Sequence, residues 1–449
     1  MQRMTKLVTA LGALAIVVGA CGGGASPTPA PATPAPSTAP STAPEVTPVP
    51  APSEAAFPAG DFKILFWTKE GEADGGYQFV NKLTDGFTAL HPNVTFELVN
   101  KNVEVLREDF QTSSLAGDAP QLLWTVADHV GPFTAADLIL PLDDMVDKAS
   151  FVPAAADIVT ANGTLWGAPT SFGNQLMLYW NKSLAGDTAP ADSDALVAKA
   201  KELTTGANYG LVFNQTESFW LVPFLGGYGG SVFAADGVTP TLDTDAMKGA
   251  IQFMYDLKYT DKVVPPEADY NVADTLFKEG KAAFIVNGDW ALGGYAAAPD
   301  AEAPGLGDKL GVGPLPMITG HEDPKPYIAG TFIMASKAVG DNPDLKMVIS
   351  EFMKYATATA QQVDMVKTLK RLPSNATAIT DAVVTGDALL AGAAAAAQKG
   401  VPQPTNLEMR CVFDSMNAGI RDMFTGKSTD IAAITKAMQA SAEACIAKL

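Results

Sequence analysis

The stretch Phe62-Lys63-Ile64-Leu65-Phe66-Trp67 decides the fold, because a short apolar run of this kind predicts a buried β-strand. In residues 77–90 the apolar side chains recur at spacings of three and four, which predicts an amphipathic helix. The pattern repeats as a strand over 94–98, a helix over 103–110 and a strand over 122–126. This alternating order predicts a mostly parallel sheet with helices on both faces, in which ligands lie at the carboxyl ends of the strands.

The same alternation resumes beyond residue 172 and predicts a second α/β unit. Its elements are strands over 176–180, 209–213 and 282–286 and helices over 194–203 and 247–257, and a further helix is predicted over 345–352. Residues 407–449 are typical of two helices broken at Gly426-Lys427-Ser428, with Ser428 or Thr429 capping the second. With 47% hydrophobic residues among 449, the chain can bury a core of this size.

The amino terminus has the pattern of an export signal. Arg3 and Lys6 precede an apolar run over 7–18, which is too short to span a bilayer comfortably. The run ends in Val18-Gly19-Ala20-Cys21, which resembles the site where bacterial lipoproteins are cut and lipid-modified. We therefore expect a signal peptide over 1–20 and lipidation of Cys21, with an uncleaved membrane anchor as the alternative.

The composition of residues 21–56 predicts an extended tether. Their Pro, Ala, Thr and Ser content cannot build a core and favours an extended chain of roughly 3 Å per residue. A proline-rich recognition segment is the alternative. We expect an exported protein that is anchored by lipid to the outer face of the cytoplasmic membrane, in the periplasm or at the cell surface.

The charge balance and the metal-binding residue types exclude several classes of function. Acidic residues outnumber basic ones by 49 to 30, and the net charge of -19 argues against nucleic acid and anionic ligands. The histidines and cysteines are too scattered for a metal cluster; they are His91, His129 and His321 and Cys21, Cys411 and Cys445. We expect no metal and no cofactor.

The two C-terminal cysteines are candidates for a disulfide. Cys411 and Cys445 lie near the far ends of the two predicted helices, so an antiparallel helix pair brings them close. Export permits the bond, and an even number of cysteines remains once Cys21 is lipidated. Two buried free thiols are the alternative.

No catalytic motif is present in the sequence. Gly226–Gly230 follows a predicted helix over 217–225, whereas a phosphate-binding loop follows a strand. Glu70 and Glu72 could in principle serve glycoside hydrolysis, but solvated loop carboxylates or acceptors of sugar hydrogen bonds explain them better. We expect no enzyme.

Aromatic and polar residues gather just after the predicted strands. They are Trp67, Lys69, Glu70 and Glu72 after the first strand, Asp128 and His129 after the third, Glu217, Phe219 and Trp220 after 209–213, and Asp289 and Trp290 after 282–286. Aromatic faces pack on the C–H face of a sugar ring, and carboxylates accept hydrogen bonds from its hydroxyls. The set predicts a carbohydrate cleft, although any single Trp could equally be a core residue.

Several segments resemble the maltose-binding-protein group of extracellular solute-binding proteins, the receptors of carbohydrate ABC importers. The resemblance covers 61–449 and is carried by four segments: Lys63 to Trp67, Gly117-Asp118-Ala119-Pro120, Leu178-Tyr179-Trp180-Asn181-Lys182, and Phe277 to Phe284 leading to Asn287-Gly288-Asp289-Trp290. It implies an α/β, two-lobed periplasmic-binding-protein fold of type II, with a mainly parallel sheet flanked by helices in each lobe. The implied lobes are 57–172 plus 318–373 and 176–316 plus 375–449, with hinges near 172–176, 315–322 and 371–375.

The resemblance also implies sugar-binding positions. Besides the residues that follow the strands, it implies two further contacts, Asn174 and Phe413. Malto-oligosaccharide binders have an acidic residue at the position of Asn174 and a stacking Trp at that of Phe413. Gln121, His129 and Asp289 depart from the family pattern, which expects Asp, Arg and Pro there. These departures bear on the identity of the sugar and not on the fold.

The expected function is a high-affinity receptor for a carbohydrate, namely maltose, a malto-oligosaccharide or a related glucoside. It would act as a monomer and deliver the sugar to the membrane permease of an ABC transporter, closing its lobes over the ligand. Alternatives are a receptor for another solute such as a polyamine, a surface-anchored glycosidase, and a passive adhesion lipoprotein.

Overall fold

The computed structural model describes residues 56–72 and 75–449. The expected signal peptide, the lipidation site at Cys21 and nearly all of the tether lie outside the described residues. In the described part, no helix is both long and apolar enough to cross a membrane.

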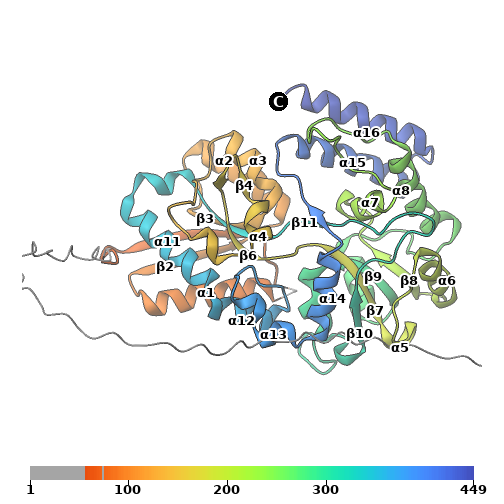
Figure 1. Ribbon diagram of the computed structural model, residues 1–449, viewed down its shortest axis with the longest axis horizontal. Helices are drawn as coiled ribbons and strands as arrows, with labels where there is room; N and C mark the ends of the chain where they lie inside the picture. Colours follow the sequence, from red (N-terminus) through yellow and green to blue (C-terminus); the bar gives the residue numbers. More distant parts are fainter. Residues whose placement is uncertain (1–55, 73–74) are drawn as a thin grey trace, which may run out of the picture. The chain divides into compact units, whose positions relative to one another are not determined.

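The first lobe is built on a five-stranded sheet in the order β2-β1-β3-β12-β6. Its strands are β1 (Phe62–Thr68), β2 (Val94–Asn100), β3 (Leu122–Val126), β6 (Ala168–Ser171) and β12 (Thr331–Ala335). Helices α1 (Gly76–Leu90), α2 (Val103–Ala116), α11 (Pro343–Thr357) and α12 (Thr359–Leu369) belong to this lobe (Figure 1). Along α1 the apolar stripe of Val80, Leu83 and Phe87 is buried, whereas Leu90 in the last turn is exposed.

The second lobe is built on a four-stranded sheet in the order β10-β7-β9-β8. Its strands are β7 (Leu176–Asn181), β8 (Tyr209–Phe213), β9 (Ala282–Gly288) and β10 (Leu310–Gly313). The helices that pack with it include α6 (Ser193–Leu203), α7 (Val222–Gly227), α8 (Asp245–Tyr255), α9 (Tyr270–Lys278) and α14 (Ala388–Ala397). Shorter elements of the two lobes are α3 (Val130–Ala135), α4 (Pro153–Ile158), α5 (Lys182–Ala185), α10 (Leu292–Ala296), α13 (Ala382–Thr385), β4 (Thr160–Ala161) and β5 (Thr164–Leu165).

Each sheet contains one strand that runs against the others, while the remaining strands share one direction, which agrees with the expected mainly parallel sheets. In the first sheet β1 is parallel to β2 and β3, but β12 runs antiparallel to β3 and β6. In the second, β7 runs antiparallel to its neighbours β10 and β9, while β8 is parallel to β9. The chain leaves the first sheet after β6 and returns to it only at β12, so the direction of β12 depends on a distant crossing and not on a local strand–helix–strand unit.

The crossings between the lobes lie side by side. The amide of Phe172 donates to the carbonyl of Leu372 at 2.9 Å, and the amide of Gly330 donates to the carbonyl of Gly173 at 3.0 Å. Gly173 and Asn174 both have positive φ, 141° and 52°, in the first crossing. Asn is one of the few residues besides Gly that adopt the left-handed conformation readily, and the amide of Asn174 is held by the carboxyl of Asp289 at 3.1 Å.

The crossings differ slightly from the expected hinges. Residues 318–325 stay with the second lobe, since the amide of Lys325 donates to the carbonyl of Pro223 at 3.0 Å. Ser374 stays with the first lobe, since its carbonyl accepts from the amide of Val152 at 2.7 Å. The second crossing therefore falls near 326–330, next to the short pair of β11 (Tyr327–Ile328) and β13 (Val401–Pro402).

The chain ends in two helices of the second lobe, α15 (Glu408–Phe424) and α16 (Ile431–Ile446), which lie side by side (Figure 1). The side chain of Asp430 caps α16 by accepting from the amide of Ala433 at 3.0 Å, so the cap is neither Ser428 nor Thr429. Cys411 and Cys445 form a disulfide with their Cα atoms 5.5 Å apart. The bond joins the start of α15 to the end of α16.

Candidate functional site

A cavity of about 1090 Å³ lies between the lobes. The first lobe lines it with residues that follow β1 and β3 and with the start of α2, and the second lobe with residues that follow β8 and β9, the start of α9 and one face of α15. Ligand sites of proteins measure roughly 300–1,000 Å³. The cavity, called the cleft below, is therefore large enough for a ligand of several rings.

Most of the residues predicted as ligand contacts line this cleft. They are Lys69, Glu70, Glu72, Asp128, Asn174, Glu217, Phe219, Trp220, Trp290 and Phe413. Three others, Trp67, His129 and Asp289, are buried and do not line it. Their positions show what each side chain does instead.

Trp67 and His129 point into the first lobe. β1 extends to Thr68, so Trp67 is a strand residue with 8% exposure, and the ammonium of Lys101 lies 4.2 Å from its ring centre. His129 is fully buried, with its Nδ1 2.7 Å from the hydroxyl of Thr125. Burial, and then the nearby Arg107, hold the pKa of His129 well below its usual value, so the imidazole is neutral at pH 7.

Asp289 faces the first crossing rather than the cleft. Its Oδ2 accepts a hydrogen bond from the amide of Asn174 at 3.1 Å. A Cβ on Gly173 would lie 2.3 Å from the same oxygen, so only glycine fits there. Burial raises the pKa of Asp289 to about 6, although Arg371 opposes the shift. We read Asp289 as a residue that positions the crossing.

A buried ion cluster lies at one end of the cleft. Glu70 contacts the ammonium of Lys69 at 3.0 Å and the guanidinium of Arg371 at 2.8 Å. Burial alone would raise the pKa of Glu70, but Arg371 and Lys69 lower it to about 2. The carboxylate is therefore ionised at any physiological pH and holds Lys69 at the cleft wall.

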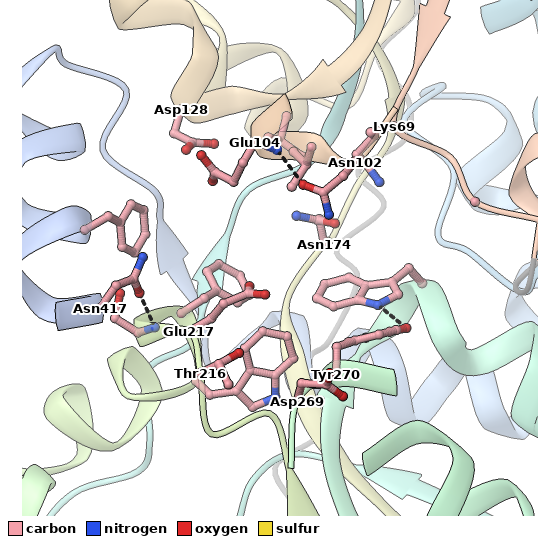
Figure 2. Close-up of a pocket in the computed structure, with 18 of the residues that line it drawn as sticks. Lys69, Asn102, Glu104, Asp128, Asn174, Thr216, Glu217, Asp269, Tyr270 and Asn417 are labelled. Atoms are coloured by element: carbon pink, nitrogen blue, oxygen red, sulfur yellow. Dashed lines mark hydrogen bonds between the residues drawn. The ribbon is translucent and has the colours of Figure 1, made fainter. Parts of the chain in front are cut away.

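Three other carboxyl groups lie on the two walls of the cleft. Asp128 and Glu104 extend from the first lobe and Glu217 from the second (Figure 2). Burial, and then the charge of Glu104, raise the pKa of Asp128 to about 6 against the opposing charge of Arg410. Burial also raises the pKa of Glu217, whereas a hydrogen bond with Asn214 lowers it. These carboxyls can accept or donate hydrogen bonds to a ligand that reaches both walls.

Aromatic rings form part of the second-lobe wall. The Trp290 indole donates to the hydroxyl of Tyr270 at 3.0 Å, which fixes its orientation (Figure 2). Its ring centre lies 6.3 Å from those of Phe219 and Trp220. Trp220 is only 3% exposed and donates to the carbonyl of Val286 at 2.9 Å, so it supports the wall from behind. An aromatic surface beside carboxylates and amides suits a sugar.

The sequence reasoning missed polar residues that also line the cleft. They are Asn102, Glu104, Glu108, Thr216, Ser218, Asp269, Tyr270, Asn271, Arg371, Gln403, Arg410, Asp414, Asn417 and Arg421. Asn102 lies two residues beyond the end of β2, so the strand-end rule could have found it. The four on α15 fall at spacings of four, three and four, which places them along one face of the helix.

Comparisons with known proteins agree with this architecture. Residues 82–392 match the family described as bacterial extracellular solute-binding protein, a match that includes strands of both sheets. The solved maltose/maltodextrin-binding domain MalE from Bdellovibrio bacteriovorus, bound to maltotriose, is 30% identical, with a TM-score of 0.79 over 86% of this chain and 100% of that chain.

Curated relatives are similar over most of their length. The maltotriose-binding protein of Pyrococcus abyssi is 24% identical over 388 residues, which are 85% of this chain and 82% of the relative. The maltodextrin-binding protein of Bacillus subtilis is 27% identical over 353 residues, which are 75% of this chain and 80% of the relative.

Proposed function

Since the chain belongs to the bacterial extracellular solute-binding proteins, we propose that it is a carbohydrate receptor that binds maltose, a malto-oligosaccharide or a related glucoside and delivers it to an ABC permease. The observation that carries this proposal is the oriented Trp290 and Phe219 pair facing carboxyl groups of both lobes across one cleft. The similarity to proteins that bind maltotriose and maltodextrin supports the choice of sugar.

Each wall contributes a different part of recognition. Trp290 and Phe219 supply apolar faces for the C–H surfaces of the glucose rings, with Phe413 on α15 as a further ring. Asp128 and Glu217 accept hydrogen bonds from hydroxyls, while Lys69, fixed by Glu70, donates to them. Because these groups belong to both lobes, a sugar gains all of them only when the lobes are closed, and binding therefore favours the closed state.

Closure requires the lobes to rotate about the crossings near 172–175 and 326–330 and about a third crossing between α13 and α14. The first two crossings are short and hydrogen-bonded to each other, so a small change in backbone angles there moves one lobe as a body. The permease would then distinguish loaded from empty receptor by the distance between the lobes.

The chain binds its ligand without converting it and acts as an exported monomer. Lipidation of Cys21 would hold the protein at the outer face of the cytoplasmic membrane, with residues 22–56 as the tether. A Cys21→Ser variant should appear in the soluble fraction after cell lysis, whereas the unaltered protein should partition with membranes. Equal partitioning of both proteins would contradict the anchor.

Thermal unfolding of residues 57–449 against a panel of small molecules tests the ligand. A ligand that binds only the folded protein raises the unfolding free energy, by about 2.7 kcal/mol when its concentration is a hundred times Kd. The midpoint temperature of unfolding rises as a result. Maltose and maltotriose should raise it, and spermidine should not. A shift with spermidine alone would replace the sugar by a polyamine, and release of glucose from maltotriose during incubation would reveal a glycosidase.

A further inference from the structure

A second cavity of about 310 Å³ adjoins the cleft on the second lobe. Thr216, Asp269 and Arg421 line both cavities, so the two share a polar rim. The second cavity, called the side pocket below, extends from this rim between the start of α9 and the end of α15. The side pocket is therefore the immediate neighbour of the cleft at this rim.

The side pocket contains the same kinds of groups as the cleft. Phe424 lines it as an almost buried ring, and Glu267 and Asp269 provide carboxylates. The guanidinium of Arg421 forms no ion pair with any carboxylate in residues 56–72 and 75–449, which leaves its donors for a ligand. An aromatic face, carboxylate acceptors and a free guanidinium are suited to one sugar ring.

The walls of the side pocket are held by the fold. The hydroxyl of Tyr259 donates to the carbonyls of Met423 and Phe424 at 2.9 and 3.2 Å, which fixes the end of α15. The side chain of Asp269 caps α9 by accepting from the amide of Val272 at 2.8 Å, which fixes the opposite wall. A pocket between two anchored helix ends is present before the ligand binds, so binding there requires little reordering.

We propose that the side pocket is an additional subsite, which binds one further glucosyl unit of an oligosaccharide whose other rings occupy the cleft. This inference rests on the proposed function and adds a preference for chain length to it. The volume of the side pocket is at the lower end of known ligand sites. The side pocket therefore suits a single ring that continues from the cleft better than a separate oligosaccharide. The receptor then favours longer malto-oligosaccharides over maltotriose.

Val272 offers a way to block the side pocket alone. It lines the side pocket but not the cleft, and its side chain is 43% exposed in the first turn of α9. Val272→Trp fills the pocket while keeping the backbone amide that Asp269 caps. Val238 is 42% exposed and lines neither cavity, so Val238→Trp is a matched control. Glu267→Ala removes one carboxylate of the side pocket without adding bulk.

The experiment is calorimetric titration of the mature full chain, in a detergent without a sugar headgroup, with each malto-oligosaccharide from maltotriose to maltoheptaose. We expect affinity to rise about tenfold with chain length, and Val272→Trp to abolish the rise while changing the maltotriose Kd less than twofold. In Glu267→Ala the increase in affinity with chain length should be about threefold smaller than in the unaltered protein. In Val238→Trp the increase should be the same as in the unaltered protein.

Two results would overturn the subsite while leaving the receptor intact: equal affinity for all lengths, or an equal loss for all lengths in Val272→Trp. If maltotriose and all longer chains fail to bind the unaltered protein, the proposed function fails together with the subsite. The maltotriose titration therefore separates the two failures.

Discussion

Glu104 and Arg410 form an ion pair across the cleft, with Oε2 of Glu104 2.9 Å from Nη1 of Arg410. Both residues lie in the first turn of a helix, α2 in the first lobe and α15 in the second. Each also has a partner on its own helix, because Arg107 contacts Glu104 at 3.3 Å and Asp414 contacts Arg410 at 2.5 Å. The cross-lobe contact exists only while the lobes are close, whereas the partners on each helix remain when the lobes separate.

Glu104→Gln should therefore favour the open state. The pair is partly exposed, so its contribution is that of a surface ion pair, roughly 0.2–1 kcal/mol, which corresponds to at most about a fivefold loss of maltotriose affinity. The loss should be larger in 50 mM than in 500 mM salt, because salt screens the pair. Titration calorimetry at both salt concentrations measures it.

Glu351→Gln is the matched control for Glu104→Gln. Glu351 contacts Lys354 at 2.8 Å on α11, and its side chain is as exposed as that of Glu104, but neither partner lines the cleft. Its affinity should equal that of the unaltered protein at both salt concentrations. If Glu104→Gln behaves like Glu351→Gln, the ion pair does not influence closure.

Trp290→Ala should weaken sugar binding far more than it weakens the fold. Its ring lines the cleft, and aromatic residues at the centre of a binding site commonly account for roughly 2 kcal/mol or more, so we expect about a thirtyfold higher Kd for maltotriose. Trp67→Phe is the contrasting variant, because Trp67 is buried outside the cleft. Trp67→Phe should lower the midpoint temperature of unfolding and leave the Kd for maltotriose unchanged. If Trp67→Phe instead raised the Kd and Trp290→Ala did not, the sugar site would lie away from Trp290.

Asp128 should make stability depend on pH between about 4 and 6. Its folded pKa of about 6 lies above the ordinary 3.8, so its favourable contribution is present below pH 4 and lost as pH rises through 6. Asp128→Asn cannot ionise and should match the unaltered protein at pH 4 and unfold roughly 2 °C higher at pH 7. Melting curves from pH 4 to 7 check this, and a constant difference at every pH would contradict it.

The first lobe could be predicted where each element carries its own local signal. The apolar run from Phe62 and the helical spacing of Val80, Leu83 and Phe87 depend on near neighbours in sequence, and both elements are confirmed. The direction of β12 could not be predicted in the same way, because it depends on where the chain re-enters the sheet after crossing the second lobe.

The strand-end rule found much of the cleft but could not assign the orientation of each side chain. Lys69 and Glu70 follow the end of β1 and line the cleft, whereas Trp67 lies within the strand and faces the core. Arg410 and Asn417 were missed because they reach the cleft from α15, far from any strand. A binding wall built by a helix has no strand end to mark it in sequence.

Glu70→Gln should strongly destabilise the protein. Glu70 and Arg371 are 2% and 3% exposed, and removing one member of such a buried pair costs about 3–5 kcal/mol, because a buried charge loses its compensating carboxylate. Glu97→Gln is the control, since Glu97 pairs with Lys63 at 2.7 Å on the surface, where a loss below about 1 kcal/mol is expected. Urea unfolding at pH 7 compares the two variants.

The same pair predicts an acid limit for the fold. The folded pKa of Glu70, about 2, lies below the ordinary 4.5, so its contribution is present above pH 4.5 and is lost as the pH falls toward 2. The unfolding free energy of the unaltered protein should therefore approach that of Glu70→Gln on acidification, while the gap to Glu97→Gln stays small throughout. A gap between the unaltered protein and Glu70→Gln that is as wide at pH 3 as at pH 7 would mean that the charge of Glu70 does not stabilise the fold.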